Sequence, residues 1–386
     1  GVEVETPQVA GKDDQIDVNF SVEEQPSGSI SGTLAYSQGY GLIIGGNYQQ
    51  SNLQGSGNSL NVGLSLSQFQ KSLNFNYFDP YFTMDGISRG FNLFLRRLDY
   101  DARNIARYST DAAGLGVNFG LPISETQRIN FGVLAEYTEI TEGYYAAQEI
   151  SEFIEVNGST SVNLKANVSW SRSTLNRGIF ADRGTSQSIA AEISVPGSEL
   201  QFYKFIYNGE RYFPITNSWT LRLRTELGYG GGYGDTPGLP FYEHFYSGGF
   251  GSIRGFENST LGPRSTPPLD AEGNPVYFRD RNGDPFGGNL LVEATAELIF
   301  PMPFVDDNRQ FRPALFVDAG NVFNTNCPTV SINCFGFDAD NFRYSVGFGV
   351  SWLSGMGPLT FSFAKPFQTQ PFDEKEMFQF ELGRTF

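Results

Sequence analysis

The chain has 386 residues, and its 26 Lys and Arg against 42 Asp and Glu give a formal net charge of −16. Such an acidic chain offers no basic surface for phosphates, which argues against nucleic acid as a partner. The 39% hydrophobic content excludes a disordered chain. Aromatic residues reach 15% and 45 residues are Gly, which together favour an all-β protein with many tight turns. No apolar run approaches the ~18 residues that would predict a transmembrane helix.

Residues 1–27 differ from the rest of the chain. Val2–Thr6 and Gln15–Val22 are predicted to be two short strands joined by a polar turn at 10–14. The chain opens within what resembles a strand, and no signal peptide is visible before it. We therefore expect residues 1–27 to be the end of a soluble domain whose earlier part is missing from this sequence.

From Gly28 onward, apolar and polar residues alternate strictly in about sixteen segments. In one of them Tyr344, Val346 and Phe348 alternate with small or polar residues. A period of two is typical of a strand with one apolar and one polar face. The segments lie near 28–37, 41–50, 58–69, 71–79, 86–98, 110–122, 126–143, 161–173, 185–196, 201–214, 218–231, 288–301, 311–323, 342–353, 357–366 and 376–386.

These segments are long enough to cross a bilayer. Many run to about 10–13 residues, against ~5–6 in ordinary globular sheets. Aromatic residues such as Phe300, Phe342 and Trp352 stand at segment ends, where membrane-interface girdles lie. Short turns alternate with longer polar loops, and the number of segments is even. The sequence predicts an all-β fold, a closed antiparallel β-barrel in a bacterial outer membrane over residues 28–386. A soluble sandwich is the alternative.

One long loop, at about 232–287, lacks sustained alternation. Loops of this length are usually functional or disordered. The stretch FYEHFYSGGFGSIRGF is rich in aromatic residues and glycines, which argues against disorder. A sixteen-stranded barrel leaves an aqueous lumen, and we expect this loop to fold into it.

Cofactor, metal and catalytic sites are not expected. Cys327 and Cys334 lie seven apart in a predicted extracellular loop, where a disulfide is favoured over free thiols. The stretch from Asp280 to Asp284 resembles part of a calcium loop, but it lacks the required Gly and the closing Glu. His244 is the only histidine, so the chain offers no nucleophile constellation and no enzyme is predicted.

Several motifs together resemble a known family. The IRGF motif consists of Ile253, Arg254, Gly255 and Phe256. It is similar to a VRGF-type motif that the BamA family, the barrel subunits of the bacterial β-barrel assembly machinery, carries in a loop folded into the barrel. The wider family includes two-partner secretion transporters and organellar relatives. The resemblance covers essentially the whole chain, through YFDPYFTMDG (77–86), TLNRGIFADRG (174–184), VPGS (195–198), PFYEHFYSGG (240–249), FVDAGNVF (316–323), GMGPLTFSFAKPF (355–367) and FQFELGRTF (378–386).

The resemblance implies a protein that folds and inserts other outer-membrane proteins. Its implied partners are nascent outer-membrane β-barrel proteins, outer-membrane lipids and accessory assembly lipoproteins, the last mostly through periplasmic POTRA domains. Residues 1–27 would be the end of the last POTRA domain. Two rivals remain. A two-partner secretion transporter shares the loop motif but normally has a plug helix, and a passive porin needs an open lumen.

Arg254 is expected inside the lumen, because both the alternation and the family motif place it there. A buried guanidinium needs carboxylate partners. Glu297 shares a face with Glu293, and Asp318 alternates with Val317, so both carboxylates are predicted to face inward. We predict that Arg254 docks onto Glu297 or Asp318 and pins the loop. A solvated arginine near the loop tip is the alternative.

The seam, meaning the join between the first and last strands, is expected to be weak. Glycine costs a strand roughly 0.5–1 kcal/mol relative to Ala, and glycines occur in both strands. We hypothesise that the seam opens laterally and pairs with an incoming strand. Alternatively, the glycines relieve crowding at a barrel corner. The seam residues are Gly28, Ile30, Gly32, Leu34, Tyr36, Phe378, Phe380, Leu382, Gly383 and Phe386.

Overall fold

A computed structural model describes residues 2–382 except 13, 23–25, 39, 104, 278–282, 303–309 and 356. Gly383 and Phe386, which were assigned to the seam, lie outside the described residues, as do Asp280 and Asn282 of the calcium-like stretch. Within the described part, no helix has the length and apolar character needed to cross a membrane.

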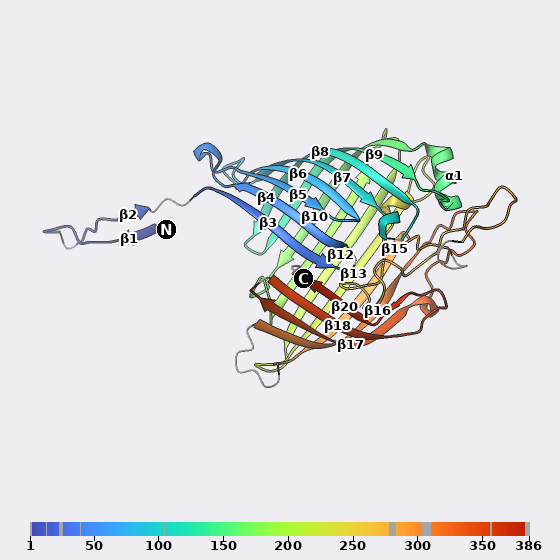
Figure 1. Ribbon diagram of the computed structural model, residues 1–386. Helices are drawn as coiled ribbons and strands as arrows, with labels where there is room; N and C mark the ends of the chain where they lie inside the picture. Colours follow the sequence, from blue (N-terminus) through green and yellow to red (C-terminus); the bar gives the residue numbers. More distant parts are fainter. Residues whose placement is uncertain are drawn as a thin grey trace.

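Sixteen antiparallel strands close into one barrel (Figure 1). This confirms the predicted fold, and the predicted segment bounds agree well; the largest offset in the described part is three residues, at the end of β5. The strands are β3 (Gly28–Ser37), β4 (Gly41–Gln50), β5 (Ser59–Leu66), β6 (Gln70–Asp79), β7 (Ser88–Asp99), β8 (Tyr108–Ser124), β9 (Gln127–Glu142), β10 (Thr160–Ser173), β11 (Gly184–Ser194), β12 (Phe202–Pro214), β13 (Thr220–Gly232), β15 (Leu290–Ile299), β16 (Phe311–Phe323), β17 (Arg343–Ser354), β18 (Gly357–Phe367) and β20 (Phe378–Leu382).

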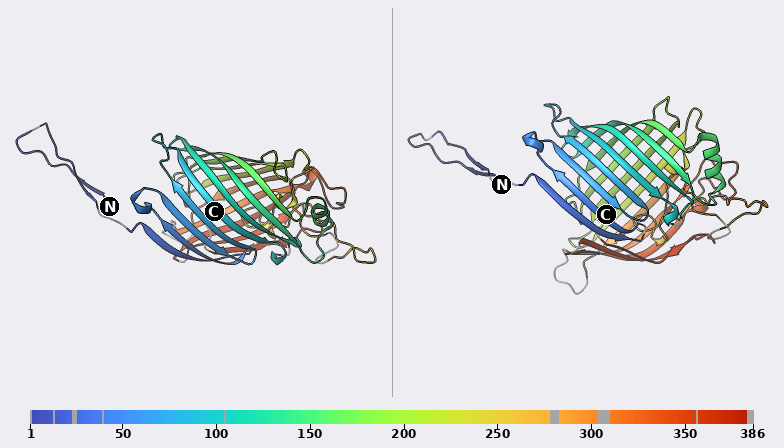
Figure 2. Two further views of the ribbon diagram at one scale, coloured as in Figure 1. Left: turned by 90° about the horizontal axis from the view of Figure 1, so that it is seen from above. Right: turned by 45° about the horizontal axis from the view of Figure 1, so that its top comes forward.

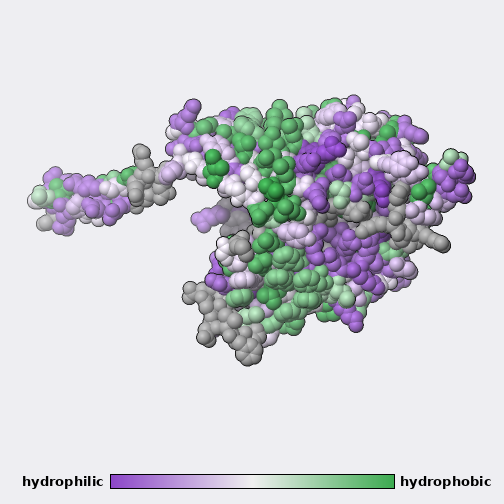
Figure 3. Space-filling view, viewed as in Figure 1, coloured by the Kyte–Doolittle hydropathy of each residue, from purple (hydrophilic) through white to green (hydrophobic). Residues whose placement is uncertain are grey.

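The outside of the barrel carries an apolar belt. Figure 3 shows it as a band across the middle of the molecule, with polar side chains gathered at the end where the loops lie. The belt arises because every second side chain of each strand points outward. At the opposite end, Trp219 stacks on Phe300 with ring centroids 5.5 Å apart, and Phe311 stacks on Trp352 at 5.7 Å. These aromatic pairs lie where an interfacial girdle belongs.

The N-terminal segment forms a separate hairpin. Strands β1 (Val2–Glu5) and β2 (Asn19–Val22) pair only with each other. Figures 1 and 2 show this hairpin projecting from the end of the barrel away from α1. That residues 1–27 form the end of a separate domain, and that this is a POTRA domain, stays a prediction.

One helix was not predicted. Helix α1 (Gln148–Asn157) lies in the loop between β9 and β10, at the far end of the barrel from the N-terminal hairpin (Figure 1). Its Ile150 is fully buried in an aromatic cluster with Tyr108, Phe241 and Phe286. The helix is only 10 residues long, which is short for detection from periodicity alone. Short 3₁₀ turns lie at Leu53–Gly55, Asp101–Arg103, Phe241–Glu243 and Ala339–Asn341.

The long loop between β13 and β15 contacts the inner wall of the barrel. Within it, β14 (Gly255–Phe256) pairs with β19 (Lys375–Glu376), which directly precedes the last barrel strand. This small two-stranded sheet is separate from the barrel sheet. We call residues 233–289 the lumen loop. The lumen loop therefore occupies part of the interior, and the residues that hold it against the wall define the candidate site.

Candidate functional site

Arg254 is held by two carboxylates of the barrel wall. Its Nε and Nη2 donate to the Asp318 carboxylate at 2.8 and 2.7 Å, and its Nη1 donates to Glu297 Oε1 at 2.7 Å. The guanidinium also lies 3.3 Å from the ring centroid of Phe316. Asp318 is fully buried. Arg254 thus contacts both of the partners proposed from strand parity, and the two-pronged contact with Asp318 fixes its orientation.

The charges around Arg254 form a connected network. Glu297 also accepts from Arg222 Nη1 at 2.8 Å, and Arg222 Nε donates to Glu210 at 2.6 Å. The network therefore runs from β12 through β13 and β15 to the lumen loop. A buried charge without a partner costs several kcal/mol, so each member holds the others in place.

The other residues of the motif pack tightly. Ile253 and Phe256 are completely buried and cluster with Leu261 of the same loop. Gly255 has a φ of +89°, and a Cβ placed on it would lie 3.1 Å from the Cβ of Ala364 in β18. The loop therefore approaches the wall closely at a point where only glycine fits without strain.

A second group of ion pairs holds the lumen loop at a position that precedes Arg254 in the chain. Glu243 accepts from Lys165 Nζ and Lys204 Nζ, both at 2.9 Å, and Lys165 also contacts Glu136 at 2.9 Å. The two lysines hold the pKa of Glu243 well below its usual range, against the effect of burial. The sequence analysis did not identify Glu243 as an anchor of the loop. Lys165 alternates with Leu164 and Ala166, so its inward direction was the available signal.

His244, next to this anchor, is a packing residue. Its Nδ1 donates to the Phe286 carbonyl at 3.0 Å, and the two rings meet edge to face. Burial lowers its pKa to about 4. Throughout the described residues, no group of three or more His, Cys, Asp or Glu side chains is placed to hold a metal ion.

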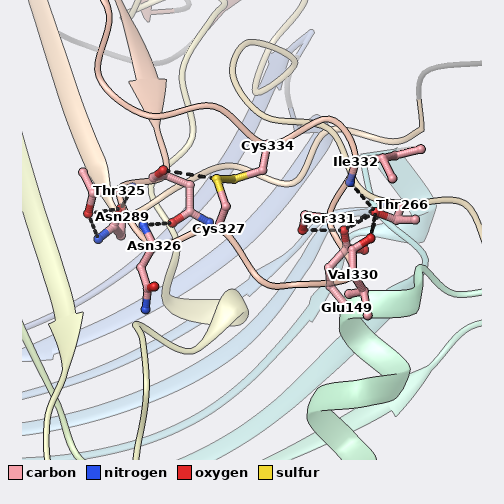
Figure 4. Close-up of a disulfide and its surroundings, with 11 residues drawn as sticks. Glu149, Thr266, Asn289, Thr325, Asn326, Cys327, Val330, Ser331, Ile332 and Cys334 are labelled. Carbon is pink, nitrogen blue, oxygen red and sulfur yellow. Dashed lines mark hydrogen bonds between the residues drawn. A yellow bond between two sulfur atoms is a disulfide. The ribbon is translucent and has the colours of Figure 1, made fainter.

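Cys327 and Cys334 form a disulfide in the loop between β16 and β17 (Figure 4). Ser331, inside the disulfide ring, donates to Glu149 Oε1 of α1 at 2.8 Å, and Glu149 also accepts from Thr266. Figure 4 shows these three side chains converging beside the disulfide. The disulfide loop, α1 and the lumen loop are thereby joined above the barrel mouth.

The seam has a very short ladder. In the described residues, β20 pairs with β3 at only two positions, Glu381 with Ser37 and Leu382 with Tyr36. On its other edge β20 pairs with β18 at five positions, and β8 pairs with β9 at sixteen. On its other edge, β3 pairs with β4 without a break through Gly28 and Gly32. The weakening effect of these glycines stays a prediction.

Side chains supplement the seam at the end nearer the extracellular loops. Ser37 Oγ donates to Glu381 Oε1 at 2.7 Å, and Tyr36 stacks on Phe380 with centroids 5.9 Å apart. Beyond the two paired positions, Gln38 Oε1 accepts from the Phe380 amide at 2.8 Å and Nε2 donates to the Phe378 carbonyl at 3.4 Å. The side-chain amide of Gln38 therefore makes the two hydrogen bonds with β20 that a backbone peptide group would otherwise make.

The remaining seam residues point outward. Ile30 is 85% exposed and Leu34 is 67% exposed, so both present apolar surface to the surrounding lipid. Phe378 is also exposed, whereas its neighbours Gln379 and Glu381 are buried on the lumen side. The outward and inward residues follow the parity predicted from alternation.

Known proteins are similar to this chain in both sequence and structure. A family model for the Omp85 superfamily domain matches residues 52–386. The outer membrane protein assembly factor BamA of Neisseria meningitidis serogroup B is 35% identical over 411 aligned residues, covering 100% of this chain and 50% of that protein. BamA of Nitratidesulfovibrio vulgaris is 25% identical, with 97% of this chain and 44% of that protein covered. The chain spans about half the length of these curated relatives.

Solved structures agree with these relatives. The crystal structure of BamA from Haemophilus ducreyi lacking POTRA domains 1–3 matches with a TM-score of 0.87 at 31% identity, covering 100% of this chain and 75% of that chain. CdiB from Acinetobacter baumannii has a TM-score of 0.59 at 14% identity, with 99% and 65% covered, and shares the fold alone. By its barrel, its docked lumen loop and these similarities, the chain belongs to the Omp85 superfamily and, within it, to the BamA family of outer-membrane barrels.

Proposed function

We propose that this barrel folds and inserts other β-barrel proteins into the outer membrane, and that it does so at the seam between β20 and β3. The proposal rests on the number of paired positions at each join between neighbouring barrel strands. The seam has two paired positions in the described residues, whereas the other fifteen joins of the barrel have from five to sixteen.

A short ladder makes the seam the join that opens at least cost. Along the described residues, Gly28–Ala35 have no strand partner on the side that faces β20. Unpaired backbone in hydrocarbon costs several kcal/mol per group, so an edge there strongly favours pairing with another strand. A nascent outer-membrane strand that adds to β3 would satisfy these groups by β-augmentation.

The proposed partners are inferred from the similarity to BamA and from the exposed seam. The substrates are nascent outer-membrane β-barrel proteins, and outer-membrane lipids contact exposed seam residues such as Ile30. Accessory assembly lipoproteins would bind mainly through POTRA domains, of which residues 1–27 would be the end. The docked lumen loop supports assembly over passive diffusion, because a porin needs an open lumen.

The test is a removable covalent lock on the seam. Tyr36→Cys with Leu382→Cys places two cysteines directly opposite each other across the join. The matched control, Leu34→Cys with Ile44→Cys, locks the other edge of β3 to β4. Each pair is introduced into the full-length protein, which is reconstituted in liposomes and assayed for folding of a reporter barrel.

The seam lock is expected to stop reporter folding almost completely, and reduction is expected to restore it. The control lock should leave the rate unchanged, because β3 and β4 stay paired in any lateral opening. Reduction of the unsubstituted protein controls for loss of the Cys327–Cys334 disulfide. Reporter folding at the normal rate with the seam locked would disprove the proposal.

A further inference from the structure

The last barrel strand is bound from inside by the motif that carries Arg254. Gln379 is one of two inward residues of β20 and is almost completely buried. Its Nε2 donates to the backbone carbonyl of Phe256 at 2.8 Å. Phe256 follows Arg254 by two residues, so one side chain of the last strand contacts the backbone of the docked motif.

A backbone ladder extends this contact. Gly255 and Phe256 pair with Glu376 and Lys375 in the two-stranded sheet of β14 and β19. The Glu257 amide adds a hydrogen bond to the Glu374 carbonyl at 2.9 Å. The lumen loop therefore runs beside the segment that leads directly into β20.

Two buried arginines bind residues 372–374, which directly precede β19. Arg264 of the lumen loop donates to the Phe372 carbonyl at 2.6 Å and lies 3.7 Å from the Glu374 carboxylate. Arg343 of β17 donates to Asp373 at 2.6 Å, and neither side chain of this pair is exposed. The residues just before β20 are thus bound to the lumen loop through Arg264 and to the barrel wall through Arg343.

The first strand is not held in this way. Across the described part of the chain, no hydrogen bond joins the lumen loop to Gly28–Ser37. Its contact with β20 consists of two ladder positions and a few side chains at one end. The two sides of the seam therefore differ: the loop holds β20 and leaves β3 unheld.

We propose that the lumen loop positions the last strand and that Gln379 is the positioning residue that transmits the docked state of Arg254 to β20. The inference rests on the proposed function of the seam. With β20 fixed to the loop, its edge keeps one position and register when β3 moves away. When Arg254 is not docked, the hydrogen bond from Gln379 to Phe256 is lost, and β20 is released.

The experiment measures hydrogen exchange of backbone amides in the full-length protein in lipid nanodiscs, without substrate. Amides of β20 exchange when the strand opens locally, so peptides that cover 374–382 report its hold. Gln379→Met keeps the length of the side chain and removes its donor. The matched control is Gln49→Met, a glutamine on the opposite face of β4 from outward Tyr48 whose side chain makes no hydrogen bond in the described residues.

Gln379→Met is expected to raise exchange in 374–382 by about tenfold, the factor that corresponds to one lost buried hydrogen bond. Gln49→Met should leave these peptides unchanged. Arg254→Gln should also raise their exchange, and the double variant should exceed either single variant by less than twofold, because both changes break the same connection. The heat-modifiable shift of the barrel on gels checks folding.

Unchanged exchange in 374–382 with Gln379→Met would overturn the inference, and so would effects of Arg254→Gln and Gln379→Met that simply multiply. If Gln379→Met does not fold, Gln379→Leu also removes the donor with a side chain of similar size, and the same criteria apply. Because no substrate is present, failure here leaves the seam-lock experiment unaffected. Failure of the seam lock likewise leaves this structural coupling measurable.

Discussion

The lumen loop and the seam both join parts of the chain that are distant in sequence, yet they are built differently. The loop is held by buried ion pairs at both Glu243 and Arg254. Among the described residues, the seam has two ladder positions and an exposed glutamine contact. Buried charged contacts are costly to break, whereas exposed hydrogen bonds are not. Among the described residues, the contacts that hold the loop are therefore stronger than those that hold the seam, as the proposed function requires.

The largest effect is expected at Arg254. Arg254→Gln leaves the buried Asp318 carboxylate without its guanidinium, which should lower the free energy of unfolding by about 3–5 kcal/mol. Denaturant unfolding of the refolded barrel in detergent measures this change. Arg183→Gln is the control, because that side chain is 70% exposed in its ion pair with Asp182 and should matter little. Equal losses in the two variants would contradict the comparison.

The next effect is a pH dependence of the loop anchor. The pKa of His244 falls to about 4 on burial, against about 6.5 when unfolded. Between these values the unfolded chain takes up a proton and the folded chain does not, so stability falls as the pH drops from 6.5 to 4. The full loss is about 3 kcal/mol. The unfolding midpoint of His244→Gln should change less with pH across this range than that of the unsubstituted protein. An equal pH dependence in the two proteins would contradict the role given to His244.

Removing the disulfide should have a smaller effect. Cys327→Ser with Cys334→Ser frees a ring closed by a sequence separation of 7, which corresponds to about 2 kcal/mol. The loss should appear mainly as faster proteolysis of the loop between β16 and β17, near its contact with α1. Adding reductant to the unsubstituted protein should reproduce the effect, and adding it to the double variant should change nothing. A serine variant as protease-resistant as the parent would show that the ring is not needed.

The smallest effect on stability is expected at the seam. Gln38→Ala removes two exposed hydrogen bonds and should cost under about 1 kcal/mol. The same change should slow disulfide formation between Tyr36→Cys and Leu382→Cys several-fold, because the strands separate more often. Gln368→Ala, which removes an exposed glutamine contact to the Asp340 carbonyl at 2.9 Å, is the control. If Gln38→Ala destabilised the barrel as much as Arg254→Gln, the contrast between the two regions would be wrong.

Strand positions were accessible from sequence because alternation is a local property. Each lipid-facing position needs an apolar residue, so β16 at Phe311–Phe323 was predicted with its exact bounds. The same parity placed Glu297 and Asp318 inward, where Arg254 contacts both. Helix α1 was missed, because a short helix stabilised by a buried Ile150 depends on distant aromatic partners rather than on its own periodicity.

The weakness expected of the seam stays a prediction. Glycines at 28 and 32 were expected to weaken the first strand, and both lie in a strand that pairs along its full length with β4. Among the described residues, two positions of β3 pair with β20, which depends on the register of two strands at opposite ends of the chain. Strand register across such a separation leaves no local signature in the residues.

The sequence by itself determined the barrel, its lipid-facing and lumen-facing residues, and the residue types able to hold a loop inside it. These features depend on a period of two residues and on the cost of burying charge. Only the tertiary structure decided that Lys165 and Lys204 share Glu243, that Gln379 contacts Phe256, and which described residues pair across the closing join. Each of these is a meeting of segments far apart in the chain, which only closure of the barrel brings together.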